Sequence, residues 1–384
     1  MGTLLSPISE ENMDCKHFGT CGSCRLYEGG YAAQHKLKSD EIHALFKELY
    51  SGEITPFFSP DSHYRARAEF KIWHVGDDIR YAMNPIERGG KMVLIEECPM
   101  VIEPIEKLMW PLLESIKVLG MGHKLFGLDF LSSSAGEIAV SMLYHRKLDS
   151  AWEEQARALA EQHGIKVIGR SRKQKVVLGE DFVTETLNIN GKPFLFRHIE
   201  NSFTQPNPRV NEKMVGWSLE QFKGISGDLL ELYCGAGNFT IPFASQFEKV
   251  LATEISKSSI NAAQANMELN GETNIEFVRM SAEEFVQALD GVREFRRMKE
   301  IDLTGYELST IFVDPPRAGM DEASCAFASR FEHLLYISCN PETLKRDLEL
   351  LTKTHTIETM AMFDQFPYTA HMEMGVKLTK RHKV

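Results

Sequence analysis

The sequence predicts an α/β protein whose C-terminal half, from about residue 205, is a doubly wound parallel sheet. Two observations carry this prediction. Short apolar runs alternate with helical segments from Asp228 to Leu351, which is typical of a parallel sheet with helices on both faces. A glycine turn, CGAGNF, also separates the first of these strands from the helix that follows it. The first half lacks this alternation, and we expect it to form a smaller α+β domain.

Composition narrows the class of protein. The 384 residues are enough for two domains with their own cores. No stretch approaches the roughly 18 uninterrupted apolar residues of a membrane span, and the first residues lack the pattern of a secretion signal. We therefore expect a cytoplasmic protein without a membrane partner. The net charge of −11 argues against an indiscriminate nucleic-acid binder, but it leaves room for a specific one with a local basic face.

The N-terminal half predicts helices over 31–49 and 101–118, a break at 56–60, and strands within 125–145 and over 166–170 and 176–178. Residues 64–74 alternate between apolar and polar side chains, which predicts a half-buried strand. Its outer face carries three cations and Glu69, the turn after residue 169 is basic, and each is either solvated or contacts an RNA backbone. The basic side chains are Arg65, Arg67, Lys71, Arg170, Arg172, Lys173 and Lys175.

The C-terminal half predicts strands at 228–233, 250–254, 275–279, 309–314 and 334–338, with helices at 256–269, 282–289 and 342–351. Residues 357–363 and 373–379 could close the sheet as an antiparallel pair.

The glycine turn predicts a ligand site. Gly235 and Gly237 allow a ligand to approach the backbone, but the third glycine of the dinucleotide fingerprint is absent, which disfavours NAD. Glu254 ends the next strand, where a carboxylate either accepts both hydroxyls of a ribose or only caps a helix. The ligand that fits the turn and the acid is S-adenosylmethionine.

Three further features lie at strand ends. Cys339 falls between a strand and a helix that Asn340 and Pro341 can start, so we expect the helix dipole to lower its pKa; the alternative is a small buried residue. Asp314-Pro315-Pro316-Arg317 is either a simple turn or a support for a base, and its arginine disfavours an adenine methylase. Glu373 has apolar neighbours that should raise its pKa, which suits a base; alternatively it is a surface residue.

Five motifs make the family recognisable: LELYCGAGNF, ATEISKSSINAAQAN, IFVDPPRAG, YISCNPETL and FDQFPYTAHMEMGV. They closely resemble the tRNA uracil-5-methyltransferases that make ribothymidine in the T-loop, and the resemblance runs from about Ser62 to Lys380. It implies a Rossmann-like class I methyltransferase domain at 205–384 and an RNA-binding α+β domain at 31–204, preceded by a cysteine-rich segment at 1–30.

The resemblance also implies roles for single residues. Cys339 would add to C6 of uracil, so that C5 can attack a methyl donor, and Glu373 would then remove the C5 proton. Phe126 and Arg317 would contact the RNA. The residues that would bind S-adenosylmethionine are Gln205, Tyr233, Asn238, Glu254 and Asp314.

Four cysteines depart from the best-known tRNA enzymes. Cys15, Cys21 and Cys24, with Cys98 far downstream, resemble the iron–sulfur ligands of the related ribosomal-RNA enzymes. Four thiolates suit a [4Fe–4S] cluster or structural zinc, and unliganded thiols are the third alternative. We expect a cluster that ties the N-terminal loop to the region of Cys98.

The main functional hypothesis is C5 methylation of a uridine in the T-arm of tRNA, with tmRNA as a second substrate, by a monomeric enzyme. Two alternatives remain at this point. One is the same chemistry on ribosomal RNA, and the other is a tRNA-binding folding factor whose catalysis is secondary.

Overall fold

The computed structural model describes residues 13–298 and 301–382, and its larger sheet has eight strands. They are β1 (Ile54–Phe57), β11 (Asp228–Leu232), β12 (Val250–Thr253), β13 (Ile275–Val278), β14 (Leu308–Val313), β15 (His333–Ser338), β16 (His355–Phe363) and β17 (Glu373–Lys380). The order is β1-β16-β17-β15-β14-β11-β12-β13. The strands from β15 to β13 are parallel, and β17 pairs antiparallel with both β15 and β16, as predicted.

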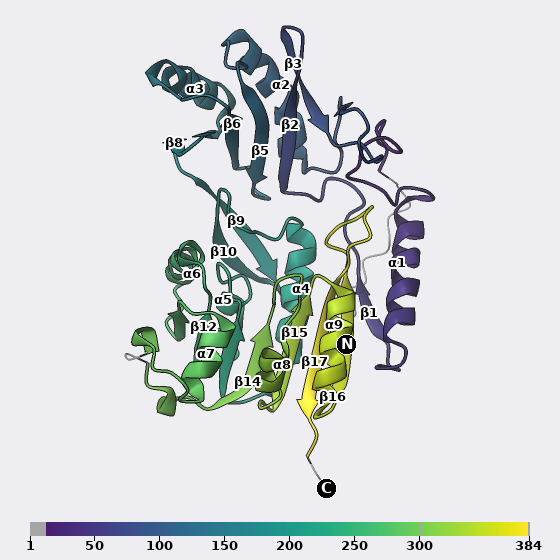
Figure 1. The fold of residues 1–384 in the computed structure, drawn as a ribbon, viewed down its shortest axis with the longest axis vertical. Helices are drawn as coiled ribbons and strands as arrows, with labels where there is room; N and C mark the ends of the chain where they lie inside the picture. Colours follow the sequence, from purple (N-terminus) through teal and green to yellow (C-terminus); the bar gives the residue numbers. More distant parts are fainter. Residues whose placement is uncertain (1–12, 299–300, 383–384) are drawn as a thin grey trace.

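Helices cover both faces of this sheet (Figure 1). They are α1 (Gly30–Phe46), α4 (Pro208–Gln221), α5 (Thr240–Phe243), α6 (Lys257–Asn270), α7 (Ala282–Leu289), α8 (Glu322–Ala328) and α9 (Pro341–Leu351), with 3-10 turns at Arg296–Met298 and Leu303–Gly305. Neighbouring strand residues point to opposite faces, so Leu230 and Ile311 belong to one core and Leu229 and Phe312 to another. The doubly wound fold is confirmed.

The second lobe has a seven-stranded sheet in the order β4-β3-β2-β5-β6-β7-β8, with two helices packed on it. Its elements are β2 (Arg67–Val75), β3 (Asp78–Met83), β4 (Val93–Leu94), α2 (Glu103–Val118), β5 (Leu125–Ser132), β6 (Ile138–Tyr144), α3 (Ser150–His163), β7 (Lys166–Ser171) and β8 (Gln174–Leu178). A hairpin, β9 (Phe182–Ile189) and β10 (Lys192–Ile199), joins it to the first lobe.

The sheets do not follow the predicted residue ranges strictly. The predicted break at 56–60 overlaps β1, which pairs in parallel with β16, and α1 packs on α9, so residues 30–57 belong with the C-terminal half. The β9–β10 hairpin likewise contacts α4 and α6. A pairing partner so distant along the chain leaves no local pattern, and strands as short as β1 carry little periodicity. Within the described residues, we find no helix long and apolar enough to cross a membrane.

Candidate active site

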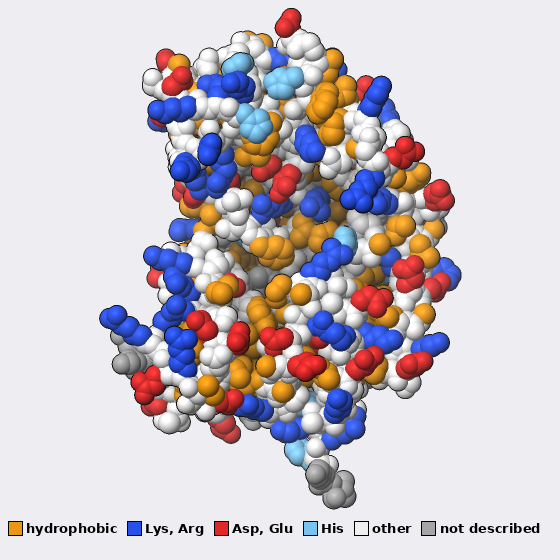
Figure 2. Space-filling model, viewed as in Figure 1, with side chains coloured by type: hydrophobic (Ala, Val, Ile, Leu, Met, Phe, Trp, Pro, Cys, Tyr) orange, Lys and Arg blue, Asp and Glu red, His pale blue; other side chains and the backbone are white. Residues whose placement is uncertain are grey.

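A cavity of about 510 Å³ opens at the carboxyl ends of the central parallel strands, where ligands bind in such sheets. The space-filling view shows a hollow between the two lobes, with hydrophobic side chains inside it and basic ones at its border (Figure 2). The cavity brings together all the residues predicted for donor binding and chemistry: Gln205, Tyr233, Asn238, Glu254, Asp314, Cys339 and Glu373. Arg317 also lines it.

The glycine turn after β11 has the backbone that the sequence predicts. Gly235 and Gly237 have φ values of 56° and 84°, in the left-handed region that glycine enters freely. A Cβ at Gly235 would meet nothing within 4 Å, so this glycine leaves open space above the turn. Tyr233 has a φ of 65°, which is uncommon for a residue with a side chain and is held here by the surrounding turn.

Glu254 both supports the turn and faces the cavity. One carboxylate oxygen accepts from the backbone N–H of Ser256 at 2.7 Å and the other from that of Gly235 at 3.2 Å. Each oxygen has a second lone pair, so the carboxylate can still accept hydroxyls from a ligand. The next residue, Ile255, is 67% exposed and lines the same cavity. The sequence analysis did not identify this apolar side chain.

Two amide side chains orient residues that were predicted to bind the methyl donor. The sequence analysis did not identify either of these amides. Asn211, on α4, exchanges two hydrogen bonds with Asn238, at 2.7 and 3.0 Å. Gln365, which follows β16 and is fully buried, donates to Gln205 Oε1 at 3.2 Å. Both partners lie far away along the chain, so no local spacing pointed to them.

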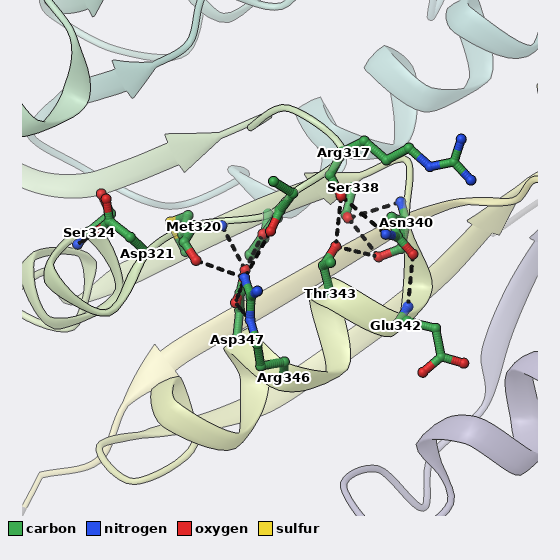
Figure 3. A network of polar contacts seen from close by, with 12 residues as sticks. Arg317, Met320, Asp321, Ser324, Ser338, Asn340, Glu342, Thr343, Arg346 and Asp347 are labelled. Carbon is green, nitrogen blue, oxygen red and sulfur yellow. Dashed lines mark hydrogen bonds and ion pairs between the residues drawn. The ribbon is translucent and has the colours of Figure 1, made fainter.

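The loop after β14 is held against α9 (Figure 3). Asn340 and Thr343 donate to the carbonyl of Arg317 at 3.1 and 3.3 Å. Arg346 donates to the carbonyl of Met320 at 2.8 Å, and the buried Asp347 accepts from the N–H of Met320 at 2.9 Å. These bonds fix the backbone of the loop, while the Arg317 side chain points away from the network (Figure 3). Within the described chain, its guanidinium has no ion-pair or hydrogen-bond partner.

Cys339 directly follows β15 and precedes a helix that Asn340 caps and Pro341 begins, as the sequence predicts. The prediction of a lowered pKa is wrong for the free protein. Burial raises the pKa of the Cys339 thiol to about 11, and the nearby carboxyls of Glu373 and Asp314 add to the rise. A backbone N–H and Arg317 act in the opposite direction but are outweighed.

The two carboxyls of the cavity also have raised pKa values. Burial raises the pKa of Glu373 from 4.5 to about 8, with a smaller contribution from Asp314. Burial alone raises the pKa of Asp314 from 3.8 to about 7. The raised pKa predicted for Glu373 is thus confirmed, and the alternative of a surface position is wrong, since the residue is only 4% exposed.

Phe126 lies outside this cavity, on the second lobe. It is 38% exposed and stacks on His145 with ring centroids 4.0 Å apart. Arg172 and Lys173 line a hollow beside this pair and have no ion-pair partner among the described residues. The other basic side chains that the sequence offered for RNA contact already have partners within the protein. Arg170 and Lys175 form ion pairs with acidic side chains. Arg65 and Arg67 donate to backbone carbonyls, and Lys71 donates to Asn84.

Three cysteines of the N-terminal segment and one of the second lobe face one small cavity. Cys15, Cys21, Cys24 and Cys98 all line it, together with mainly apolar side chains. The thiols are unpaired, and the pKa of Cys24 is raised to about 12, first by burial and then by Cys21 and Cys15. Among residues 13–298 and 301–382, however, no group of three or more potential ligands lies in a metal-binding arrangement.

The fold and the cavity define a class of protein. A doubly wound sheet with a glycine turn after its first central strand, a carboxylate after the next and no third glycine is that of the class I methyltransferases that use S-adenosylmethionine. Comparison with a solved structure agrees on the fold: a Pyrococcus abyssi tRNA (uracil-54, C5)-methyltransferase in complex with S-adenosyl-L-homocysteine has a TM-score of 0.70 at 22% identity, covering 92% of this chain and 85% of that one.

Sequence comparison gives the family. The family model of tRNA (Uracil-5-)-methyltransferase matches residues 30–381. A tRNA/tmRNA (uracil-C(5))-methyltransferase of Sulfurimonas denitrificans is 61% identical over 96% of this chain and 100% of its own length. One of Acinetobacter baylyi is 48% identical over 91% and 98%. The chain belongs to the tRNA (uracil-5-)-methyltransferase family, and the predicted membership is confirmed.

Proposed function

We propose that the protein methylates C5 of a uridine in the T-loop of tRNA, with S-adenosylmethionine as the methyl donor. The observation that carries the proposal is the convergence of a thiol, a buried carboxyl and a methyl-donor cavity at one sheet edge. Cys339 directly follows β15, Glu373 begins the neighbouring antiparallel strand β17, and both line the same cavity as the glycine turn. The names of the relatives support both tRNA and tmRNA as substrates.

The donor site fits the methyl donor on its own chemistry. The open space above Gly235 and the carboxylate of Glu254 suit a nucleoside, and the exposed Ile255 offers an apolar surface for its base. When bound, the donor supplies an electrophilic methyl group and a positive charge. That charge would favour the ionised forms of Asp314 and Glu373, whose pKa values are raised in the free protein.

The proposed chemistry uses two residues in sequence. The Cys339 thiolate adds to C6 of uracil, which makes C5 an enolate carbon that takes up the methyl group. Glu373 removes the remaining proton from C5, and the C6–sulfur bond then breaks to release the thiolate. Because the Cys339 pKa is about 11 in the free protein, substrate binding must favour thiolate formation, and the unpaired cation of Arg317 is placed to contribute.

The position of Cys339 also indicates where the RNA backbone leaves the site. C6 is bonded to N1, which carries the ribose, so the sugar must extend past the thiol on the side away from the donor. A groove of about 580 Å³ lies there between α1 and α9, and it shares only Cys339 and Arg317 with the donor cavity. Lys345 can contact a phosphate in this groove, and Glu41 and Glu342 can accept ribose hydroxyls.

The T-loop uridine is stacked inside a folded RNA, so it must be extruded to reach Cys339. The Phe126–His145 pair offers an aromatic face on the second lobe on which exposed bases can stack. Arg172 and Lys173, beside this pair, supply cations for the backbone. This local basic face offsets the overall negative charge of the chain.

We further propose that the four cysteines hold a [4Fe–4S] cluster, with zinc as the alternative. Their convergence on one cavity with mainly apolar lining supports a metal group with four thiolate ligands. The thiols would have to move closer together, because no metal-binding arrangement is formed as they stand within the described residues. The cluster would have a structural role, and we route no chemical step through it. A cytoplasmic location and a monomeric state also stay predictions.

The decisive experiment is mass spectrometry of nucleosides after incubating tRNA, tmRNA and ribosomal RNA separately with the enzyme and S-adenosylmethionine. We expect 5-methyluridine in tRNA, at a T-loop position, and none in ribosomal RNA. Cys339→Ala should abolish the product while retaining tRNA affinity within about tenfold, because the thiol acts in chemistry more than in binding. Methylation of ribosomal RNA alone would overturn the substrate, and an effect on tRNA folding that Cys339→Ala retains would favour the folding factor.

A further inference from the structure

The loop between β16 and β17, residues 364–372, leads directly into Glu373. Most of its hydrogen bonds to the rest of the chain go to the N-terminal segment, residues 13–38, and Phe57 and Tyr64 add one each. Tyr368 lies at the centre of the loop, is fully buried and has a φ of 60°. Residues with a side chain seldom adopt this left-handed conformation, and it persists only where the surroundings over-determine it. The contacts of Tyr368 show what determines it here.

Each polar group of Tyr368 is bonded to a residue between 13 and 34. Its N–H donates to Gln34 Oε1 at 3.2 Å. Its carbonyl accepts from the backbone N–H groups of Arg25 and Leu26 at 2.8 and 2.9 Å. Its hydroxyl accepts from the N–H of Met13 at 3.3 Å. None of these hydrogen bonds goes to the eight-stranded sheet, so the conformation of Tyr368 depends on the N-terminal segment.

A second set of contacts holds the start of the loop. Asp364 is fully buried and accepts from Lys38 Nζ at 2.6 Å and from Gln34 Nε2 at 2.9 Å. Lys38 also donates to the carbonyl of Phe366 at 3.1 Å. A buried ion pair with these additional hydrogen bonds is sensitive to small displacements, because either charge left alone in the interior is strongly unfavourable.

The same segment contains three of the four cysteines. Cys24 immediately precedes the Arg25 and Leu26 N–H groups that bind Tyr368. Cys24 and Tyr368 also belong to one hydrophobic cluster, against which Cys98 packs. The ring of Phe18, between Cys15 and Cys21, lies 5.8 Å from that of Tyr368. The cysteine cavity and the loop therefore share a single core.

We propose that residues 13–38 act as a brace that holds Tyr368 and Asp364 and thereby positions Glu373 for proton removal. Tyr368 is a positioning residue, since it touches neither the cavity nor the reacting atoms. The inference rests on the proposed function, because it assumes that Glu373 is the base. It predicts that loosening the brace stalls the reaction after methyl transfer, when the C5 proton must leave, rather than before Cys339 adds to the uracil.

The first arm of the test compares the wild-type enzyme with three variants. Tyr368→Ala removes the ring and hydroxyl, Tyr368→Phe keeps the ring, and Tyr81→Ala removes an equally buried tyrosine from the other lobe, where its hydroxyl donates to Met109. We expect Tyr368→Ala to lower turnover by about 100-fold, as a displaced catalytic group does, and to accumulate a covalent enzyme–RNA complex on natural tRNA. Capture of 5-fluorouridine tRNA should change little, and Tyr368→Phe should resemble the wild type.

Gln34→Ala gives a second arm if Tyr368→Ala fails to fold, since it removes one hydrogen bond to Tyr368 and one to Asp364. It should also accumulate the complex, whereas Tyr81→Ala should not. Equal losses of 5-fluorouridine capture and turnover, without a complex on natural tRNA, would overturn the brace. Glu373→Gln separates the hypothesis that Glu373 is the base from the hypothesis that residues 13–38 position it. If Glu373→Gln accumulates the complex and the brace variants do not, only the brace is wrong. If Glu373→Gln does not accumulate the complex, the assignment of the base is wrong, and so is the brace, which depends on it.

Discussion

Cys339 and Glu373 flank the last pair of the antiparallel β15–β17 ladder: Cys339 directly follows Ser338, and Glu373 directly precedes its partner Met374. This register places the thiol and the carboxyl beside each other, although they come from different motifs. Their proximity is also evident electrostatically, because Glu373 contributes to the raised pKa of Cys339. The proposed reaction needs such neighbouring positions, because the nucleophile adds to one ring carbon and the base removes a proton from the adjacent one.

The first prediction concerns Glu373→Gln. The amide cannot accept the C5 proton, so addition and methyl transfer should proceed while elimination stalls. We expect a covalent enzyme–RNA band on denaturing gels with natural tRNA, which the wild type does not accumulate. An inactive variant that forms no such band would mean that Glu373 positions the substrate, and full activity would exclude both roles.

The second prediction concerns pH. Glu373 must be ionised to act as a base, and its pKa in the free enzyme is about 8. In single-turnover experiments the rate of elimination should therefore rise with pH, reach half of its maximum near that value and level off above it. Asp314 and Cys339 share the cavity, and titration of Asp314 near 7 should contribute a weaker inflection. A rate of elimination that does not change between about pH 6 and pH 9 would contradict the assignment of the base, since this range extends about one pH unit or more on either side of the pKa values of Glu373 and Asp314.

The same shift predicts a stability effect of known sign. The folded state binds the Glu373 proton more tightly than the unfolded state, in which the pKa of this carboxyl is near 4.5. The protonated carboxyl therefore contributes its full stability to the fold below pH 4.5, and this stability is lost as the pH rises through about 8. Relative to Glu373→Gln, the wild type should lose at most about 1.4 kcal/mol of unfolding free energy per pH unit in this window. Urea unfolding of both proteins at several pH values measures the difference. A difference that stays constant would show that Glu373 titrates normally.

The third prediction concerns the methyl donor. Glu254→Ala should raise the Michaelis constant for S-adenosylmethionine far more than that for tRNA, because the carboxylate faces the donor cavity and supports the glycine turn. Glu248→Ala, an exposed glutamate before β12, is the matched control and should change neither constant. Equal changes in both constants for Glu254→Ala would indicate a role in the fold alone.

The fourth prediction concerns the groove between α1 and α9. Lys345→Ala should raise the Michaelis constant for tRNA by about tenfold and leave donor affinity unchanged, because one phosphate contact is lost. The slope of the logarithm of tRNA affinity against the logarithm of salt concentration should also decrease by about one, because one fewer counterion is released on binding. Lys353→Ala, just beyond the C-terminal end of α9, lies outside the groove and serves as the control. Indistinguishable salt slopes for the two variants would place the RNA backbone elsewhere.

The fifth prediction concerns the four cysteines. Anaerobic purification should give a coloured protein with absorbance near roughly 400 nm, from sulfur-to-iron charge transfer. Cys24→Ser should lose the colour and lower thermal stability, because Cys24 lies in the buried cluster around Tyr368. Stoichiometric zinc in a colourless protein would replace the iron–sulfur assignment, and the absence of any metal would contradict the site.

Much of the site could be predicted because it depends on local chemistry at strand ends. The turn at Gly235, the capped helix after Cys339 and the buried strand at Glu373 each leave a short pattern, and a parallel sheet brings such strand ends to one edge. The pKa of Cys339 could not be predicted in the same way. The helix dipole is local, whereas the burial and the two carboxyls that outweigh it come from separate strands.

By itself, the sequence determined the doubly wound fold, the family and the predicted donor-binding and chemical residues that the cavity brings together, since each follows from periodicity or from a contiguous motif. Only the tertiary structure decided how distant segments support them. It placed β1 in the catalytic sheet, paired Asn211 with Asn238, and set Gln34, Arg25 and Leu26 around Tyr368. The physical reason is that a hydrogen bond needs two groups close in space, and a sequence specifies closeness only within a helix turn, a strand or a tight loop.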